Sequence, residues 1–236
     1  MEQLHSPATV QQSGSLHNVT LRYLQDHPIY ESTKPYVMKR TPPLGVPRSN
    51  VKGIDCNDIV VHDVRGHEAD FHLGMQGFAF GKLTTQQRLD TPKSIECYIT
   101  EVREFLTTAL GCDDVRIFEY KLRSSESPSR VEDRSKGVSH LEYRAPSKMV
   151  HIDQTCFATK HRIRTHFPDD CDTLLKQKYR FVNVWRPLVQ ECVVDCPLAL
   201  CDASTLSDED LVECDLVYES YEGEHYKVKY NRNHRW

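Results

Sequence analysis

The sequence SKMVHIDQT, residues 147–155, holds a histidine and an aspartate two positions apart inside a short apolar run. On a β-strand, residues i and i+2 point to the same face. His151 and Asp153 would therefore lie close enough together to hold one cation. The same tripeptide also fits an ordinary half-exposed strand, so the residues alone leave both interpretations open.

The chain around this tripeptide predicts a mainly β fold with flanking helices. Short runs rich in β-forming residues are expected to be strands at 58–64, 78–80, 115–122, 140–144, 148–153, 180–188, 197–202 and 225–231. A polar stretch at 123–137 reads as a surface loop. Many short strands in the second half favour a double-stranded β-helix, the jelly-roll barrel, with helices packed outside it.

Local signals predict two helices. Thr91 suits a helix cap, Pro92 suits the first helical position, and apolar residues then recur at three- and four-residue steps as far as Gly111. A second, shorter helix is expected to begin near residues 169–170. Proline and polar residues dominate 1–55, which we expect to be an extended N-terminal arm outside the core, followed by a single domain over 56–236.

The composition restricts the class of protein. With 39% hydrophobic and 27% charged residues, the 236-residue chain is expected to be globular. A net charge of -4 without a basic run argues against a nucleic-acid partner, and no apolar stretch is long enough to suggest a membrane span. Nine cysteines without a secretory signal indicate reduced thiols and a cytoplasmic location.

A jelly roll would give the His-x-Asp tripeptide a chemical role. Non-haem iron oxygenases hold Fe(II) with two histidines and one carboxylate on one face, so His151 and Asp153 are candidates for two of the three ligands. The third should be a later histidine on a neighbouring strand. The histidines that follow are His161, His166, His225 and His234. His225 precedes a strand-like run at a suitable separation and is the candidate for this position.

The stretch NVWRPL, residues 183–188, places Trp185 and Arg186 side by side. In one interpretation Trp185 packs in the core and Arg186 makes a structural ion pair. In the other, Arg186 faces the pocket and binds an anionic group of the substrate or co-substrate. Both interpretations stay open.

Several stretches together carry a family resemblance. The stretches are HDVRGHEADFHLGMQGFAF (62–80), VHIDQT (150–155), NVWRPL (183–188), VVDCPLALCDAS (193–204) and YNRNHRW (230–236). In this order they resemble the fungal hydroxylase/desaturase family of the aspergillic acid and cercosporin pathways, which is related to gibberellin desaturase and a cephamycin methoxylation protein. The resemblance extends from about residue 58 to Trp236.

The resemblance implies an oxidoreductase of fungal secondary metabolism that hydroxylates or desaturates a small-molecule biosynthetic intermediate. It implies Fe(II) and 2-oxoglutarate as cofactors and places His151 and Asp153 among the iron ligands. It assigns His234 to the family's N-x-x-H-x-W element. The third ligand and the co-substrate arginine are expected in a segment beyond Trp236, so the jelly roll is expected to be incomplete at its C-terminal strands.

Three explanations of that early end are considered: a gene model that stops short, a degenerate paralogue, or a partner chain that completes the site. They lead to an alternative function. The chain would then be a catalytically degenerate relative that acts as an interaction partner, in a homo- or heterodimer, or one that has no activity.

Overall fold

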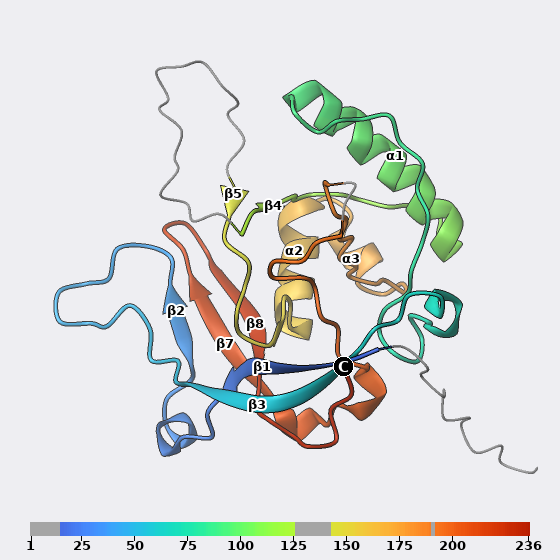
Figure 1. Cartoon of the computed structure of the whole chain (residues 1–236). Coiled ribbons are helices and arrows are strands. Elements are labelled where there is room, and N and C mark those ends of the chain that lie inside the picture. Colours follow the sequence, from blue (N-terminus) through green and yellow to red (C-terminus); the bar gives the residue numbers. More distant parts are fainter. Residues whose placement is uncertain (1–14, 126–142, 190–191) are drawn as a thin grey trace, which may run out of the picture. The chain divides into compact units, whose positions relative to one another are not determined.

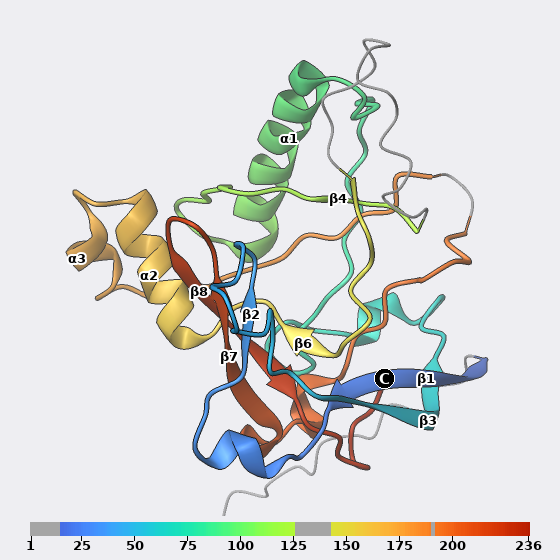
Figure 2. The same ribbon diagram turned by 90° about the vertical axis from the view of Figure 1, so that its left-hand side faces the viewer.

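The computed structural model describes residues 15–125, 143–189 and 192–236 (Figures 1 and 2). Its contacts divide the chain into two compact units. The first unit consists of Met1–Phe80, Lys148–Arg186 and Leu198–Trp236, and the second of Gly81–Ser147 and Pro187–Pro197. Each unit is described by itself.

The first unit contains most of the strands. They are β1 (Leu16–Leu24), β2 (Tyr36–Met38), β3 (Gly53–His62), β6 (His151–Ile152), β7 (Leu211–Val217) and β8 (Glu222–Val228). Its helices are α2 (Cys156–His166), α3 (Cys171–Leu174) and short 3₁₀ helices at Pro28–Glu31, Glu68–Asp70, Ala203–Thr205 and Asp208–Asp210. The second unit contains α1 (Pro92–Leu110), β4 (Leu122–Arg123) and β5 (Tyr143–Arg144).

A four-stranded sheet with the order β2-β7-β8-β6 organises the first unit. Strands β7 and β8 form a long antiparallel hairpin (Figure 1), in which Cys214 pairs with His225. Beyond β8, the short β6 runs antiparallel and pairs His151 with Lys227. At the hairpin end, the rings of Tyr218 and Tyr221 stack with centroids 4.4 Å apart. The hairpin therefore brings residues of the C-terminal part beside the His-x-Asp tripeptide.

Strand β1 connects this sheet to a second pair of strands. It pairs antiparallel with β3 along its length, with a bulge between Val19 and Leu21. On its other side, the carbonyl of Arg22 accepts the Val150 backbone N–H at 2.9 Å, just ahead of β6. Tyr23 and Leu24 are 0% and 1% exposed. The expectation that residues 1–55 stay outside the core is therefore wrong, because the end of β1 is buried in it, while the division into an arm and one domain stays a prediction.

The helix expected after Thr91 is confirmed as α1. The Thr91 hydroxyl accepts a hydrogen bond from the Ser94 backbone N–H at 3.1 Å. The Ser94 hydroxyl accepts one from the Thr91 backbone N–H, also at 3.1 Å. Gly111 ends the helix with φ 56°, in the left-handed region that glycine adopts at little cost. Ile95 and Val102 are buried on the apolar stripe. The prediction succeeded because caps and periodicity act within a few residues of each other.

Several expected strands are absent from the described residues. Segments 78–80, 180–188 and 197–202 form no ladder there, and only Leu122 of the run 115–122 belongs to a strand. Phe78 and Phe80 instead pack with Phe71, with ring centroids 5.0 Å, 5.8 Å and 5.9 Å apart. Side chains with high β propensity can favour an extended backbone, but a strand also requires a neighbour to supply hydrogen bonds. Most of the loop expected at 123–137 lies outside the described residues.

The strands β1, β2 and β7 and the helix α2 were not foreseen. Helix α2 starts directly after the His-x-Asp tripeptide, where the Thr155 hydroxyl accepts the Ala158 backbone N–H at 3.0 Å. The helix expected near residues 169–170 exists only as the single turn α3, which begins after Asp170. The described part of the chain is mostly sheet with few helices, as expected. None of its helices is both long enough and apolar enough to span a bilayer.

Candidate functional site

The candidate site lies on one face of the β6–β8 ladder. His151 and Lys227 are paired across the ladder, so their side chains share a face. Asp153 and His225 lie two positions from these residues, in the directions that place them on the same face. The four side chains of His151, Asp153, His225 and Lys227 are called the β6–β8 face below. Figure 2 shows β6 beside β8.

His151 is held in a single orientation. Its Nδ1 lies 2.7 Å from the carbonyl oxygen of Met149, and because a carbonyl can only accept, Nδ1 carries the proton. The other ring nitrogen, Nε2, faces Oδ1 of Asp153 at 3.2 Å. A histidine that donates from one nitrogen to a carbonyl while the other faces a carboxylate has the orientation of a metal ligand.

Asp153 is oriented by a residue from a distant segment. The side-chain amide of Asn183 donates to Oδ2 of Asp153 at 2.7 Å, which leaves Oδ1 directed at His151. The Asp153 side chain is about half exposed, at 51%. This carboxylate can therefore accept a cation from solvent without reorganising its support.

His225 is buried on the same face. It is 7% exposed, and its ring centroid lies 6.1 Å from that of His151. Its Nε2 is buried with no hydrogen-bond partner in the described residues. Burial, reinforced by the charges of Lys227 and His151, lowers the pKa of His225 to about 3. At neutral pH His225 is therefore an uncharged imidazole.

Lys227 completes the face with a charge. The residue is 8% exposed, and burial lowers the pKa of its ammonium group below the usual range. Within the described ranges, the Lys227 ammonium makes no hydrogen bond and no ion pair.

These residues fit two protein ligands of a metal ion. His151 and Asp153 converge, and each is supported from behind by Met149 or Asn183. Among the described residues, no group of three or more histidine, cysteine, aspartate or glutamate side chains is close enough to hold a metal. His225 lies near the pair without joining it in such a group, so its assignment as the third ligand stays a prediction.

The other residues singled out from the sequence lie elsewhere. Trp185 is 50% exposed, so the interpretation that it packs in the core is wrong. Arg186 has a buried guanidinium nitrogen, and its role stays a prediction. His161 stacks on Phe157 of the same helix α2. His234 is held by Asp210 at 3.1 Å and by the Tyr23 hydroxyl at 3.3 Å, which identifies the closing motif as structural.

Sequence reasoning missed Asn183 and Lys227. Asn183 is the first residue of the motif NVWRPL, in which only Trp185 and Arg186 were considered as candidates. Lys227 lies two residues after His225, and that alternation was a usable signal, because the period of a strand places both side chains on one face. The pairing of this strand with residues 151–152 could not be read from the local sequence.

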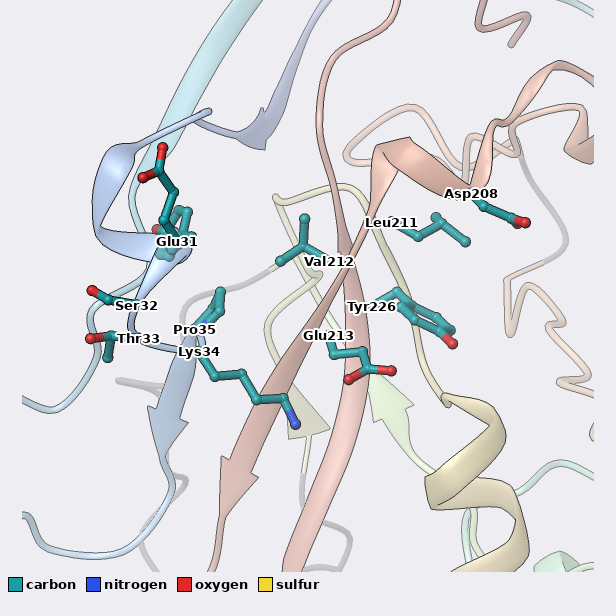
Figure 3. A pocket seen from close by; sticks show the side chains of 11 residues that line it. Glu31, Ser32, Thr33, Lys34, Pro35, Asp208, Leu211, Val212, Glu213 and Tyr226 are labelled. Carbon is teal, nitrogen blue, oxygen red and sulfur yellow. The ribbon is translucent and has the colours of Figure 1, made fainter.

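The opposite face of β8 differs in character. There the buried Glu224 accepts from the Thr155 hydroxyl and pairs with Lys34. Lys34 also contacts Asp215 at 2.6 Å. A pocket of about 730 Å³ opens nearby, between residues 30–35 and strands β7 and β8 (Figure 3). None of its lining residues belongs to the β6–β8 face.

Known proteins share this sequence and this fold. A family model described as oxidoreductase/YMDC permease-like domain matches residues 21–236. The hydroxylase/desaturase poxK of Penicillium oxalicum is 28% identical over 189 residues, which cover 76% of this chain and 54% of the relative. The Fe(II)/2-oxoglutarate-dependent dioxygenase nvfI of Aspergillus novofumigatus is 32% identical over 158 residues, which cover 64% of this chain and 52% of the relative.

The solved structure of the iron and alpha-ketoglutarate-dependent endoperoxidase NvfI superposes with a TM-score of 0.75 at 22% identity, covering 94% of this chain and 78% of that one. The chain therefore has the fold of that structure and belongs to the oxidoreductase/YMDC permease-like domain family. Its relatives include fungal hydroxylase/desaturases, so the resemblance identified from the sequence is confirmed. The chain spans about half of the length of the curated relatives it matches.

Proposed function

We propose that this protein is an Fe(II)- and 2-oxoglutarate-dependent oxidoreductase that hydroxylates or desaturates a small-molecule intermediate of fungal secondary metabolism. The observation that carries the proposal is the supported pair of His151 and Asp153. Relatives named as hydroxylase/desaturases and as an Fe(II)/2-oxoglutarate-dependent dioxygenase support the same chemistry. We further propose that the sheet is part of a jelly roll.

The cofactors and the chain would have separate tasks. When bound, Fe(II) with 2-oxoglutarate and dioxygen would supply the oxidising chemistry that removes hydrogen from an unactivated C–H bond, dioxygen being the oxidant. His151 would bind the metal through Nε2, because Nδ1 is committed to the Met149 carbonyl. Asp153 would bind through Oδ1 while Asn183 holds Oδ2. Neutral His225, with its unsatisfied Nε2, is the candidate for the third protein ligand.

Anaerobic titration of the purified chain with Fe(II) and 2-oxoglutarate tests the proposal. We expect a saturable visible absorption band from the metal–co-substrate complex. His151→Ala should abolish the band, because it removes one of the supported donors. His161→Ala is the matched control, since His161 lies on α2 away from the pair, and it should leave the band unchanged. A well-folded chain that gives no band would contradict the proposal.

A catalytically degenerate relative that acts through a partner chain is the second function considered. One observation bears on it: the described residues include no group of three or more histidine, cysteine, aspartate or glutamate side chains close enough to hold a metal. The titration separates the two functions, because an interaction protein would fold and still show no affinity for Fe(II). The cellular location in the cytoplasm and a homo- or heterodimeric state remain proposals.

A further inference from the structure

The pocket on the opposite face of β8 carries more negative than positive charge. Three carboxylates line it, from Glu31, Asp208 and Glu213, and none of them forms an ion pair among the described residues. Lys34, the cation of the lining, is already paired with two further carboxylates. Because like charges held close together raise the local potential, a positively charged occupant would be favoured in this pocket.

The pocket also has apolar and aromatic walls. Pro35, Leu211 and Val212 contribute aliphatic surface, and Tyr30 and Tyr226 contribute rings. Its volume of about 730 Å³ lies within the range of pockets that receive a ligand, so it has room for a phenylalanine side chain. An occupant with an apolar body and cationic groups around it would match both properties of the lining.

Helix α2 presents this combination of groups on its exposed side. Phe157 is 63% exposed, and Lys160 and Arg164 follow it at three- and seven-residue steps, which places the three side chains on one side of the helix. No acidic residue occurs along Cys156–His166. Neither Lys160 nor Arg164 forms an ion pair in the part of the chain that the structure describes. These three side chains are called the exposed face of α2 below.

The pocket and α2 are neighbours within the first unit. Thr155, which caps α2, bonds to Glu224 on β8, and Tyr226 projects from the same face of β8 into the pocket (Figure 3). Burial raises the pKa of Tyr226, and the first residue of α2, Cys156, adds to the rise. One region of the unit therefore holds a positively charged projection beside a negatively charged hollow.

We propose that two copies of this chain associate through this region, with Phe157 of each copy entering the pocket of the other. A two-fold axis makes the region self-complementary, because each copy then supplies one projection and one hollow. Lys160 and Arg164 of one copy would lie against the carboxylates of the other, and such opposite charges favour the correct partner. The proposal goes beyond the proposed function, because none of the residues that line the pocket belongs to the β6–β8 face.

Sedimentation velocity of the full 236-residue chain tests the proposal. We expect a reversible dimer whose dissociation constant rises with salt, because salt screens the charge pairs. Phe157→Asp should weaken the dimer by about thirtyfold or more, as the loss of a central aromatic anchor does. Leu16→Asp is the matched control, because Leu16 is 61% exposed and lies on β1, outside both surfaces. It should leave the dissociation constant unchanged.

Reversed charges provide a sharper test. One variant, Lys160→Glu with Arg164→Glu, makes the exposed face of α2 acidic, and a second, Glu31→Lys with Glu213→Lys, makes the pocket basic. Each variant alone should be monomeric where the wild type is a dimer, because like charges meet in both halves of a two-fold interface. An equimolar mixture should form a heterodimer within about tenfold of the wild-type affinity, because both halves then pair opposite charges. Circular dichroism and thermal midpoints verify that all variants are folded.

Three results would overturn the proposal. The first is a wild-type chain that stays monomeric at about 100 µM, well above a micromolar dissociation constant. If spermine then raises its thermal midpoint, the occupant of the pocket is a small organic cation and not a second copy. The second is a wild-type dimer that Phe157→Asp leaves intact, and the third is a mixture of the reversed variants that does not associate.

Discussion

The two faces of β8 carry buried polar side chains at adjacent positions. They differ in the hydrogen-bond and ion-pair partners that these side chains have. On one face, Glu224 is bonded to the Thr155 hydroxyl and to Lys34. On the other, His225 and Lys227 are equally buried, and the His225 Nε2 has no hydrogen-bond partner in the described residues. Both faces belong to one strand, so the difference does not arise from the local backbone.

Under the proposed function, the difference is one between polar groups that serve the fold and polar groups that would bind a ligand. A satisfied buried network fixes the position of the elements it joins. Here it holds the start of α2, the segment before β2 and the middle of β8 together. Unsatisfied buried groups cost stability and are retained where a ligand completes them. Because both sets lie on β8, the satisfied face holds in place the strand from which the unsatisfied face projects.

The largest expected effect is on the satisfied face. Glu224→Ala removes a buried carboxylate and leaves the buried Thr155 hydroxyl without its acceptor, while Lys34 keeps only Asp215, so we expect a loss of about 3 kcal/mol in the free energy of unfolding. Chemical denaturation measures it. Glu222→Ala, an exposed position on the same side of the same strand, is the control and should change stability by less than about 0.5 kcal/mol. Equal losses of stability in the two variants would show that the buried contacts of Glu224 do not stabilise the fold.

A second satisfied network, at the C-terminus, provides a test by pH. Burial opposes ionisation of Asp210, but bonds from the Ser207 N–H, His234 and Asn231 outweigh it and hold the pKa of Asp210 below its usual range. A carboxyl with a lowered folded pKa stabilises the fold above its unfolded pKa and loses that contribution as the pH falls. Asp210→Asn should therefore cost about 2 kcal/mol at pH 7.

That difference should narrow from about pH 4 downward, because the wild-type carboxyl then becomes protonated as well. Denaturation midpoints of wild type and Asp210→Asn across this range measure it. A difference that stays constant with pH would show that the neutral geometry of the side chain, not its charge, stabilises the closing motif.

The support of Asp153 predicts a smaller effect, on metal affinity alone. Asn183→Ala should weaken Fe(II) binding by about tenfold, as the loss of a group that orients a ligand typically does, without lowering the thermal midpoint. Asn57→Ala is the control, because it removes a comparable exposed hydrogen bond, to Thr20 at 2.9 Å. Equal Fe(II) affinities in the two variants would mean that Asn183 does not orient Asp153.

The smallest expected effect has the opposite sign. Lys227→Met should stabilise the ligand-free chain by about 1 kcal/mol, because a buried charge without a partner is replaced by an apolar side chain of similar size. The thermal midpoint without ligand is the measurement, and Lys229→Met should leave it nearly unchanged. A lower thermal midpoint in Lys227→Met would show that Lys227 stabilises the fold. The proposed difference between the two faces of β8 would then be wrong.

The sequence alone was sufficient for the features that act over a few residues. Thr91, Pro92 and Gly111 delimit α1 through contacts with their near neighbours, so the helix could be predicted with its ends. The two-residue period of a strand brings His151 and Asp153 to one face whatever lies beside that strand. The family could also be identified, because its motifs are contiguous stretches.

Only the tertiary structure decided which distant residues lie beside the candidate ligands His151 and Asp153. Asn183 reaches Asp153 from 30 positions away, and β8 brings His225 and Lys227 beside residues more than 70 positions earlier. Residues 78–80 form no strand, since no neighbouring strand among the described residues supplies their hydrogen bonds, and the rings of Phe78 and Phe80 pack together instead. Local sequence determines the directions of side chains along one strand, whereas the choice of neighbouring strand depends on packing across the whole unit.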